Sequence, residues 1–325
     1  MRAITAEKFT GYGALALVDA PAPRPNGERV LVRVTAAGVT PLDHTILSGG
    51  FPSARAPLVL GAEGVGIVED AGESSFTVGG RVMFTGLYGV RENGAWQERL
   101  LVKPDDLTPV PDGIDDLVAA SLPVAYLTAQ LTLNMAGFKP GKTVLAPAIG
   151  GSVGNATYQL ARAQGAGRVI STAGSVAKAQ KARELGFEDV IDLTQEGLKE
   201  GVRRITDGKG VDIVIDGLGG AFIGDGLASL GFGGALITLG YSASRKSQID
   251  VTDLIWKGAR MAGFALAAQR PPAIADAWAV ILPLIENGSV QPIVARSFPL
   301  EDAAEALRHL IEDRPFGKIV LTMGA

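Results

Sequence analysis

The chain has 325 residues, of which 47% are hydrophobic and 20% charged, and its formal net charge is −4. This length allows two domains, and the acidic balance gives no basic footprint for nucleic acid or an anionic membrane. Cysteine is absent, which excludes disulfides and thiolate zinc sites. No apolar run reaches membrane-spanning length and the N-terminus has no signal-peptide core, so a cytoplasmic protein is expected.

The first 120 residues or so predict a β-rich domain, because short apolar or alternating runs lie between Gly, Pro and Asp turns. The stretch ERVLVRVTAAGV alternates for several residues, which predicts a half-exposed antiparallel strand. The expected strands cover residues 2–6, 15–18, 28–36, 64–69, 81–84 and 97–102.

From residue 120 the pattern changes to strands separated by helices, which predicts a doubly wound parallel sheet. A helix is expected over 119–136, followed by strands at 143–148, 168–172, 189–192, 211–216, 235–239 and 260–265. The remaining helices (273–287 and 301–311) and strands (291–297 and 317–322) are too few for a third domain. The predicted domains are therefore 1–119 with 267–325, and an inserted dinucleotide-binding domain over 120–266.

The stretch VLAPAIGGSVGNATYQLARA, residues 144–163, carries the clearest chemical signal. A strand, a glycine turn and a helix in this order hold a dinucleotide pyrophosphate, since glycines allow close approach and the helix N-terminus attracts negative charge. The spacing is AxxGxxG rather than the usual GxGxxG. The alternative is a purely structural turn. The expected cofactor contacts are Ala148, Gly150, Gly151, Ser152, Val153 and Gly154.

Several stretches in order along the chain resemble the zinc-independent quinone oxidoreductases, the ζ-crystallin-like family of the medium-chain dehydrogenase/reductase superfamily. They include ERVLVRVTAAGVTPLDHTILSGGFP, PLVLGAEGVGIVEDAG, AASLPVAYLTAQLTL, VDIVIDGLGG, GGALITLG and FGKIVL. The resemblance implies a GroES-like domain, a Rossmann domain, a homodimer, and reduction of quinones or α,β-unsaturated carbonyl compounds with NADPH. The alternatives are an enoyl-thioester or enone reductase of narrower range and a non-catalytic, crystallin-like NADPH-binding protein.

The residues themselves argue against a catalytic metal. Ala62 stands where zinc alcohol dehydrogenases of this superfamily carry a ligand histidine, and GVTPLDH has no cysteine. His44 and His309 are the only histidines, whereas a catalytic zinc needs three protein ligands. We therefore expect hydride transfer directly from the nicotinamide, with the protein supplying position.

The candidate catalytic residues follow from the resemblance. Thr40 is implied to orient substrate or nicotinamide, and His44 to donate a proton or hydrogen bond. For Asp43 the alternative is a helix cap. Tyr126 and Tyr241 are expected to line the cleft that the resemblance implies between the two domains. The segment GGFP has Phe51 where enoyl-thioester reductases often have a tyrosine, which weakens that alternative.

Further cofactor contacts are expected along the chain. The resemblance implies a nicotinamide contact for Thr128, whose alternative is a hydroxyl bonded to its own helix. Ligands of parallel sheets bind outside the carboxyl ends of the strands. That rule adds Gly217, Leu218, Leu239, Gly240 and Tyr241. The resemblance adds Phe264, Phe316, Gly317 and Lys318, with a solvated charge as the alternative for Lys318.

The end of the second dinucleotide strand predicts the choice of cofactor. NAD-binding folds place an acid there, about twenty residues beyond the glycines. Here Thr172, Ala173, Gly174 and Ser175 bring no carboxylate. Lys178 stands where the family neutralises the 2′-phosphate, although a solvated lysine is the alternative and Leu193 replaces a family tyrosine. The prediction is NADPH, with Thr172, Gly174, Ser175 and Lys178 at the adenosine end.

Overall fold

The structure is a computed structural model that describes residues 1–324, and the chain divides into two compact units. Unit 1 comprises residues 1–124 and the segment from 292 onward, and unit 2 comprises 125–291. The sequence-based boundaries lie at 119/120 and 266/267 instead. The larger difference arises because α9 (Pro271–Glu286) packs on α4 (Ser152–Ala163) within unit 2. The side chain of Gln159 on α4 also bonds the backbone N–H and carbonyl of Gln291.

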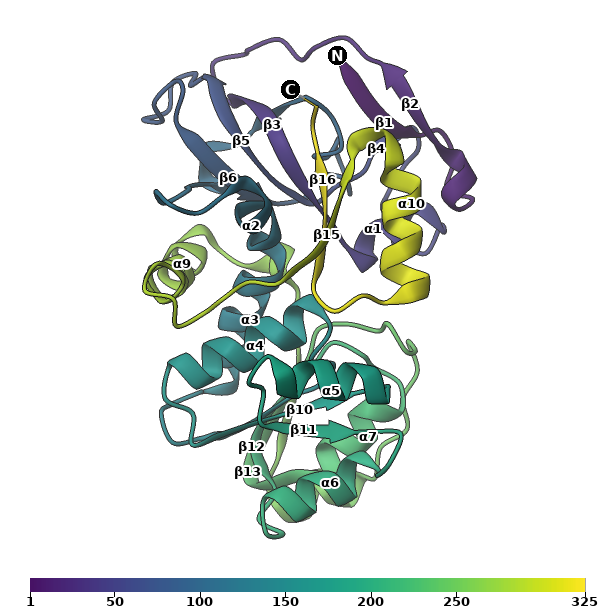
Figure 1. Ribbon diagram of the computed structural model, residues 1–325, viewed down its shortest axis with the longest axis vertical. Helices are drawn as coiled ribbons and strands as arrows, with labels where there is room; N and C mark the ends of the chain where they lie inside the picture. Colours follow the sequence, from purple (N-terminus) through teal and green to yellow (C-terminus); the bar gives the residue numbers. More distant parts are fainter. Residues whose placement is uncertain (325) are drawn as a thin grey trace. The chain divides into compact units, whose positions relative to one another are not determined.

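Unit 1 is built on two sheets, which confirms the β-rich domain that the strand pattern predicts (Figure 1). The small antiparallel sheet has the order β2-β1-β4, and the larger one the order β15-β16-β3-β5-β6-β8, with β7 also paired to β3. The strands are β1 (Arg2–Ala6), β2 (Leu15–Asp19), β3 (Val30–Val39), β4 (Leu58–Val59), β5 (Glu63–Asp70), β6 (Arg81–Thr85), β7 (Arg99–Val102), β8 (Leu107–Pro109), β15 (Val294–Pro299) and β16 (Lys318–Thr322).

Two expectations, one for unit 1 and one for the helix at the boundary of the units, are wrong. Strand β3 is not half exposed, since Arg33 is its one exposed residue. The reason is that α2 (Asp116–Ser121) packs against β3, and the valines of β3 belong to the core cluster of unit 1. The helix expected over 119–136 is two helices, α2 and α3 (Pro123–Ala136). Pro123 lacks an N–H and starts the second helix, a position that proline favours.

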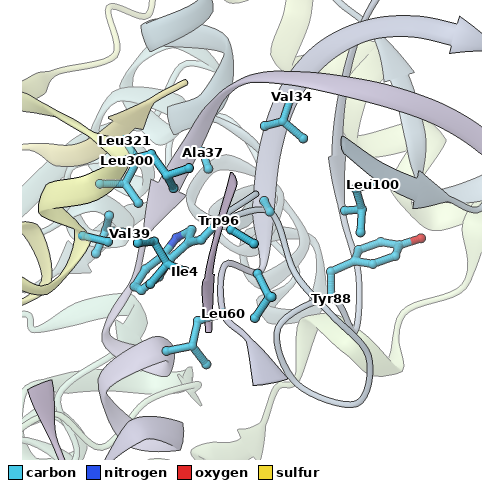
Figure 2. Packing of buried hydrophobic residues seen from close by; sticks show 14 of the residues in the cluster. Ile4, Val34, Ala37, Val39, Leu60, Tyr88, Trp96, Leu100, Leu300 and Leu321 are labelled. Carbon is cyan, nitrogen blue, oxygen red and sulfur yellow. The ribbon is translucent and has the colours of Figure 1, made fainter. Parts of the chain in front are cut away.

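The core of unit 1 surrounds Trp96, which is fully buried. Figure 2 shows its ring among Ile4, Val39 and Leu60. The Trp96 indole N–H donates to the carbonyl of Gly38 on β3, 3.2 Å away. A Cβ at Gly61 would lie 2.5 Å from the indole, so this packing requires a glycine. The core therefore fixes the loops that carry the candidate residues of unit 1, including α1 (Pro41–Leu47).

Unit 2 is a six-stranded parallel sheet with the order β11-β10-β9-β12-β13-β14, which confirms the predicted Rossmann architecture (Figure 1). Helices α6 and α7 share one core cluster with the sheet, while α4 packs on β9 and β10. The remaining elements are β9 (Thr143–Ala146), β10 (Arg168–Ala173), α5 (Val176–Glu184), β11 (Asp189–Asp192), α6 (Leu198–Ile205), β12 (Val211–Asp216), α7 (Ala221–Ala228), β13 (Leu230–Thr238), α8 (Val251–Lys257) and β14 (Arg260–Gly263).

Near the C-terminus, α10 (Ala303–Arg308) is shorter than the helix expected over 301–311. A wider turn, His309–Asp313, follows it, and the chain leaves the helix at Arg314 with φ +50°. Among residues 1–324, none of the helices combines the length and the hydropathy that a membrane crossing needs.

Candidate functional site

Thr40 and Asp43 form a closed pair at the start of α1. The buried Asp43 carboxylate accepts the Thr40 N–H at 2.8 Å and the Thr40 hydroxyl at 2.7 Å through one oxygen. Its other oxygen accepts the N–H of Gly61 at 2.9 Å. Asp43 therefore caps α1 and ties it to the loop before β5, and the Thr40 hydroxyl proton is already used in this pair.

Burial raises the pKa of Asp43 to about 6. The hydrogen bonds from Thr40 and Gly61 and the charge of Lys318 act in the opposite direction and stabilise the carboxylate. Removal from water is the larger effect, because a charged group loses its hydration when it is buried. Asp43 thus titrates closer to neutral pH than an exposed aspartate does.

Lys318 is not a solvated lysine. Its ammonium group donates to the Glu63 carboxylate, and both side chains are buried. The other Glu63 oxygen accepts the N–H of Val124, 2.7 Å away, at the start of α3. A Cβ at Gly38 would lie 2.4 Å from this carboxylate, so the glycine makes room for it. The sequence analysis missed Glu63, whose signal was an acid inside the apolar run LGAEGVGIV.

Among residues 1–324, neither histidine makes a hydrogen bond to the buried residues Asp43, Glu63 and Lys318. The His44 ring is 5.8 Å from the ring of Tyr12, and its Nε2 is 3.3 Å from the Ser48 hydroxyl. His309 pairs with Asp313 at 2.7 Å, four residues further along the chain. Within residues 1–324 no group of three or more His, Cys, Asp or Glu side chains could hold a metal.

Helix α3 presents two hydroxyl groups without intramolecular bonds. Thr128 is buried, yet its hydroxyl makes no hydrogen bond among residues 1–324; Thr132 instead donates to the Thr128 carbonyl at 2.7 Å. The expected alternative, a Thr128 hydroxyl bonded to its own helix, is therefore wrong. The Tyr126 hydroxyl is likewise unbonded within that range, and burial raises the pKa of its phenol.

The glycine turn after β9 has a left-handed residue where the motif departs from glycine. Ala148 has φ +62°, a conformation that costs a non-glycine residue about 1–2 kcal/mol. Two contacts with Thr172 on β10 hold it there: the Ala148 N–H donates to the Thr172 hydroxyl at 2.9 Å, and the Ile149 N–H to the Thr172 carbonyl at 2.9 Å. Thr172 thus shapes the turn.

The helix that follows approaches this turn closely. A Cβ at Gly154 would lie 2.2 Å from the Pro147 carbonyl oxygen and 2.5 Å from that of Ala148. The N-cap of α4 is Gly151, and no side chain caps this helix. The first-turn N–H groups, those of Ser152 and Val153 among them, therefore belong to a helix end without a side-chain acceptor. A helix N-terminus of this kind, here after Gly150 and Gly151, favours the binding of an anion.

Around the carboxyl end of β10, Ser175 caps α5. Its hydroxyl oxygen accepts the Lys178 N–H at 3.3 Å. Gly174 is exposed and a Cβ there would touch nothing within 4 Å. Lys178 lies in the first turn of the same helix, with a half-buried side chain. Thr172, Gly174, Ser175 and Lys178 thus lie together at the carboxyl end of β10.

Asp216 organises the ends of β12 and β13, and the sequence analysis missed it. This buried carboxylate accepts the N–H groups of Leu218 (2.9 Å) and Gly219 and the Thr238 hydroxyl (3.1 Å). Burial raises its pKa. A Cβ at Gly240 would lie 2.4 Å from the Gly217 carbonyl, so the two expected loops touch. The available signal was the acid that ends VDIVID before GLGG.

The remaining expected contacts lie in both units. In unit 2, the Leu239 N–H donates to the Asp216 carbonyl and the Phe264 N–H to that of Thr238. Tyr241 is 43% exposed, with the Arg245 guanidinium 5.2 Å from its ring centre. In unit 1, Phe316 and Gly317 precede β16; Gly317 has φ +118°, and a Cβ there would lie 2.7 Å from the Ile293 carbonyl. Position 317 therefore requires a glycine for structural reasons, whether or not it contacts the cofactor.

Comparison with known proteins decides the family. A family model described as "Alcohol dehydrogenase GroES-like domain" matches residues 26–112, and one described as "Zinc-binding dehydrogenase" matches 152–284. A quinone oxidoreductase of Pseudomonas aeruginosa is 31% identical over 97% of this chain and 98% of its own length. The chain belongs to the quinone oxidoreductase family of medium-chain dehydrogenases/reductases.

Solved structures of similar proteins agree on this fold and differ in cofactor. This family member is 30% identical to a protein titled NAD-dependent alcohol dehydrogenase, with a TM-score of 0.89 and complete coverage of both chains. It is also 30% identical to a mycobacterial protein complexed with NADPH, with a TM-score of 0.89 and coverage of 99% of this chain and 100% of the other. Members of this family are oxidoreductases that bind a nicotinamide cofactor. This chain is therefore an oxidoreductase of this family.

Proposed function

We propose that this oxidoreductase uses NADPH to reduce quinones or α,β-unsaturated carbonyl compounds without a metal. The observation that carries the proposal is the turn from Ala148 to Gly154. Ala148 is left-handed, and a Cβ at Gly154 would clash with the carbonyl oxygens of Pro147 and Ala148, so only a glycine lets α4 start this close to the turn, with no side chain on its first N–H groups. The described residues therefore fit a dinucleotide whose pyrophosphate lies against the N-terminus of α4.

The residues of each unit have distinct proposed tasks. The nicotinamide supplies the hydride. The turn would hold the pyrophosphate. Ser175 and Lys178 would hold the 2′-phosphate, and the loops at Gly217 and Gly240 would hold the nicotinamide half of the cofactor. The Thr128 hydroxyl, which makes no hydrogen bond among residues 1–324, would bond the carboxamide of the nicotinamide.

The proton that accompanies reduction needs a donor, and Tyr126 is the candidate with the strongest support. Its hydroxyl makes no hydrogen bond among residues 1–324, and a phenol carries its proton at neutral pH. Thr40 and Asp43 are bonded to one another, so their proposed role is to position α1. His44 and Tyr241 remain candidates that contact substrate.

The activity test measures NADPH and NADH oxidation with a panel of quinones, enones, enoyl thioesters and aldehydes, with and without a chelator. We expect quinones and enones to be reduced, and NADPH to be preferred by about ten- to a hundredfold, since a charged hydrogen bond contributes roughly 1.5–3 kcal/mol. Lys178→Glu should erase most of that preference, and Lys181→Glu on the same helix is the control. Equal use of both cofactors by the parent, or activity lost with the chelator, contradicts the proposal.

We also propose that two copies pair through the free edge of the unit 2 sheet. Strand β14 ends that sheet, and an unpaired edge strand offers backbone groups to another chain. Exposed apolar side chains gather on β13, α8 and β14: Phe232 (88% exposed), Trp256 (76%), Ile255 (67%) and Met261 (44%). A two-fold dimer would cover them. Light scattering at micromolar concentration should give a dimer for the parent and a monomer for Trp256→Glu; a monomeric parent overturns the proposal.

A further inference from the structure

A carboxylate stands one strand away from the position where NAD-binding folds place their acid. That acid ends the second strand, about twenty residues past the glycines, which is the position of Ala173 here. In the sheet, Ala173 pairs in register with Asp192, the last residue of β11. Figure 1 shows β10 and β11 side by side next to α5. Neighbouring strands lie about 4.8 Å apart, and paired residues direct their side chains to the same face.

The Asp192 side chain is fixed through one of its oxygens. Thr194 donates its N–H at 3.0 Å and its hydroxyl at 2.7 Å, both to Oδ1. No hydrogen bond to Oδ2 is present among residues 1–324. The Thr194 bonds lower the pKa of Asp192, so it carries a negative charge at neutral pH. One oxygen is thus held by the turn after β11, while the side chain is buried and the charge of Arg183 on α5 also acts on it.

We propose that Asp192 is a specificity-determining residue that weakens NADPH binding relative to NADH. The inference rests on the proposed function, which places the adenosine half of the cofactor at the carboxyl end of β10. A 2′-phosphate there meets Lys178 on one side and the Asp192 carboxylate on the other, whereas the 2′-hydroxyl of NADH brings no negative charge for Asp192 to repel. The preference for NADPH is therefore a balance between the Lys178 cation and the Asp192 anion, whose charge Arg183 partly offsets.

The experiment compares Asp192→Asn with Asp189→Asn. Asparagine keeps the Oδ1 acceptor for Thr194 and removes the charge. Asp189 lies on the same strand at its other end, where it pairs with Arg168 at 3.4 Å, so its variant removes the same charge away from the site. Dissociation constants for NADPH and NADH are measured by fluorescence titration at low and high salt, so that binding is scored without any substrate.

Asp192→Asn should raise the affinity for NADPH about three- to tenfold and leave that for NADH unchanged. Because Asp192 is buried, about 0.5 M salt should leave much of this gain in place. Asp189→Asn should leave the ratio of the two constants unchanged. If both cofactors bind and Asp192→Asn does not change the ratio, the inference fails while the proposed function stands. Parallel weakening of both cofactors, or weakening of NADH alone, also overturns it.

A parent that binds neither cofactor overturns the proposed function and this inference together. Should Asp192→Asn fail to fold, Asp192→Ser, which offers Thr194 a hydroxyl acceptor, takes its place in the same titration with the same expected ratio. The melting temperature of each variant is recorded, because a purely structural role for Asp192 would lower it without changing the ratio, and that result overturns the inference.

Discussion

In unit 1 the charged residues Asp43, Glu63 and Lys318 are buried and hydrogen-bonded within the fold, whereas the glycine turn of unit 2 presents backbone N–H groups at the start of a helix. Asp43, Glu63 and Lys318 find their partners inside the fold. The turn from Ala148 to Gly154 instead leaves a helix end without a side-chain cap. The comparison teaches that unit 1 is sensitive to the loss of a charge, and unit 2 to the gain of a side chain.

The largest expected effect is on the buried ion pair. Lys318→Met leaves the Glu63 carboxylate buried without its cation and should lower the free energy of unfolding by about 3–5 kcal/mol in urea titrations. Adding Glu63→Gln should recover most of this, because the buried charge is gone and the amide oxygen still accepts the Val124 N–H. Lys199→Met is the control: Lys199 and Asp225 are exposed and 3.6 Å apart. Its cost should stay below about 1 kcal/mol.

The next effect is a pH dependence within unit 1. An unfolded aspartate loses its proton near pH 4, whereas folded Asp43 loses it near pH 6. Between these values the folded state binds the extra proton, so stability from this group falls as pH rises, by on the order of 3 kcal/mol in total. The parent should therefore lose stability relative to Asp43→Asn from pH 4 to pH 7. Asp112→Asn, at an exposed position, should follow the parent; equal slopes for parent and Asp43→Asn would contradict the prediction.

In unit 2 the sensitive change is an added side chain. Gly154→Val brings carbon atoms against the carbonyls of Pro147 and Ala148, so the turn must shift. We expect the cofactor to bind at least about tenfold more weakly, a loss of about 1.4 kcal/mol, with the fold retained by circular dichroism. Gly13→Val, where a Cβ touches nothing within 4 Å, is the matched control. Parent-like cofactor affinity in Gly154→Val would remove the assignment of the turn.

The smallest effect concerns the strained residue of the turn. Ala148→Gly should relieve the positive φ and stabilise the protein by about 0.5–1 kcal/mol, because glycine adopts this conformation without steric cost but loses more chain entropy on folding. Ala177→Gly, exposed near the start of α5, should instead destabilise it by a similar amount. Urea unfolding of both variants gives the comparison, and destabilisation by Ala148→Gly would show that the turn is not strained.

Much of the fold followed from the sequence because local patterns determine local structure. Strands β11 and β12 have the predicted bounds, since short apolar runs between turn residues leave few alternatives. Strand β3 was misjudged because its alternation says nothing about what covers its second face. Among the candidate site residues, the spacing singled out Ala148, Gly151 and Gly154, whose cofactor contacts stay a prediction, and the place of Asp43 at a helix start indicated its cap.

What the sequence by itself determined is the order of the elements, the glycine turn and the family. The tertiary structure decided which charges are neighbours. Lys318 and Glu63 are 255 positions apart and meet as the first residues of β16 and β5, which both pair with β3. Asp192 stands beside Ala173 only because β11 adds to the sheet next to β10. Electrostatic interactions depend on distance in space, and sheet order sets that distance independently of separation along the chain.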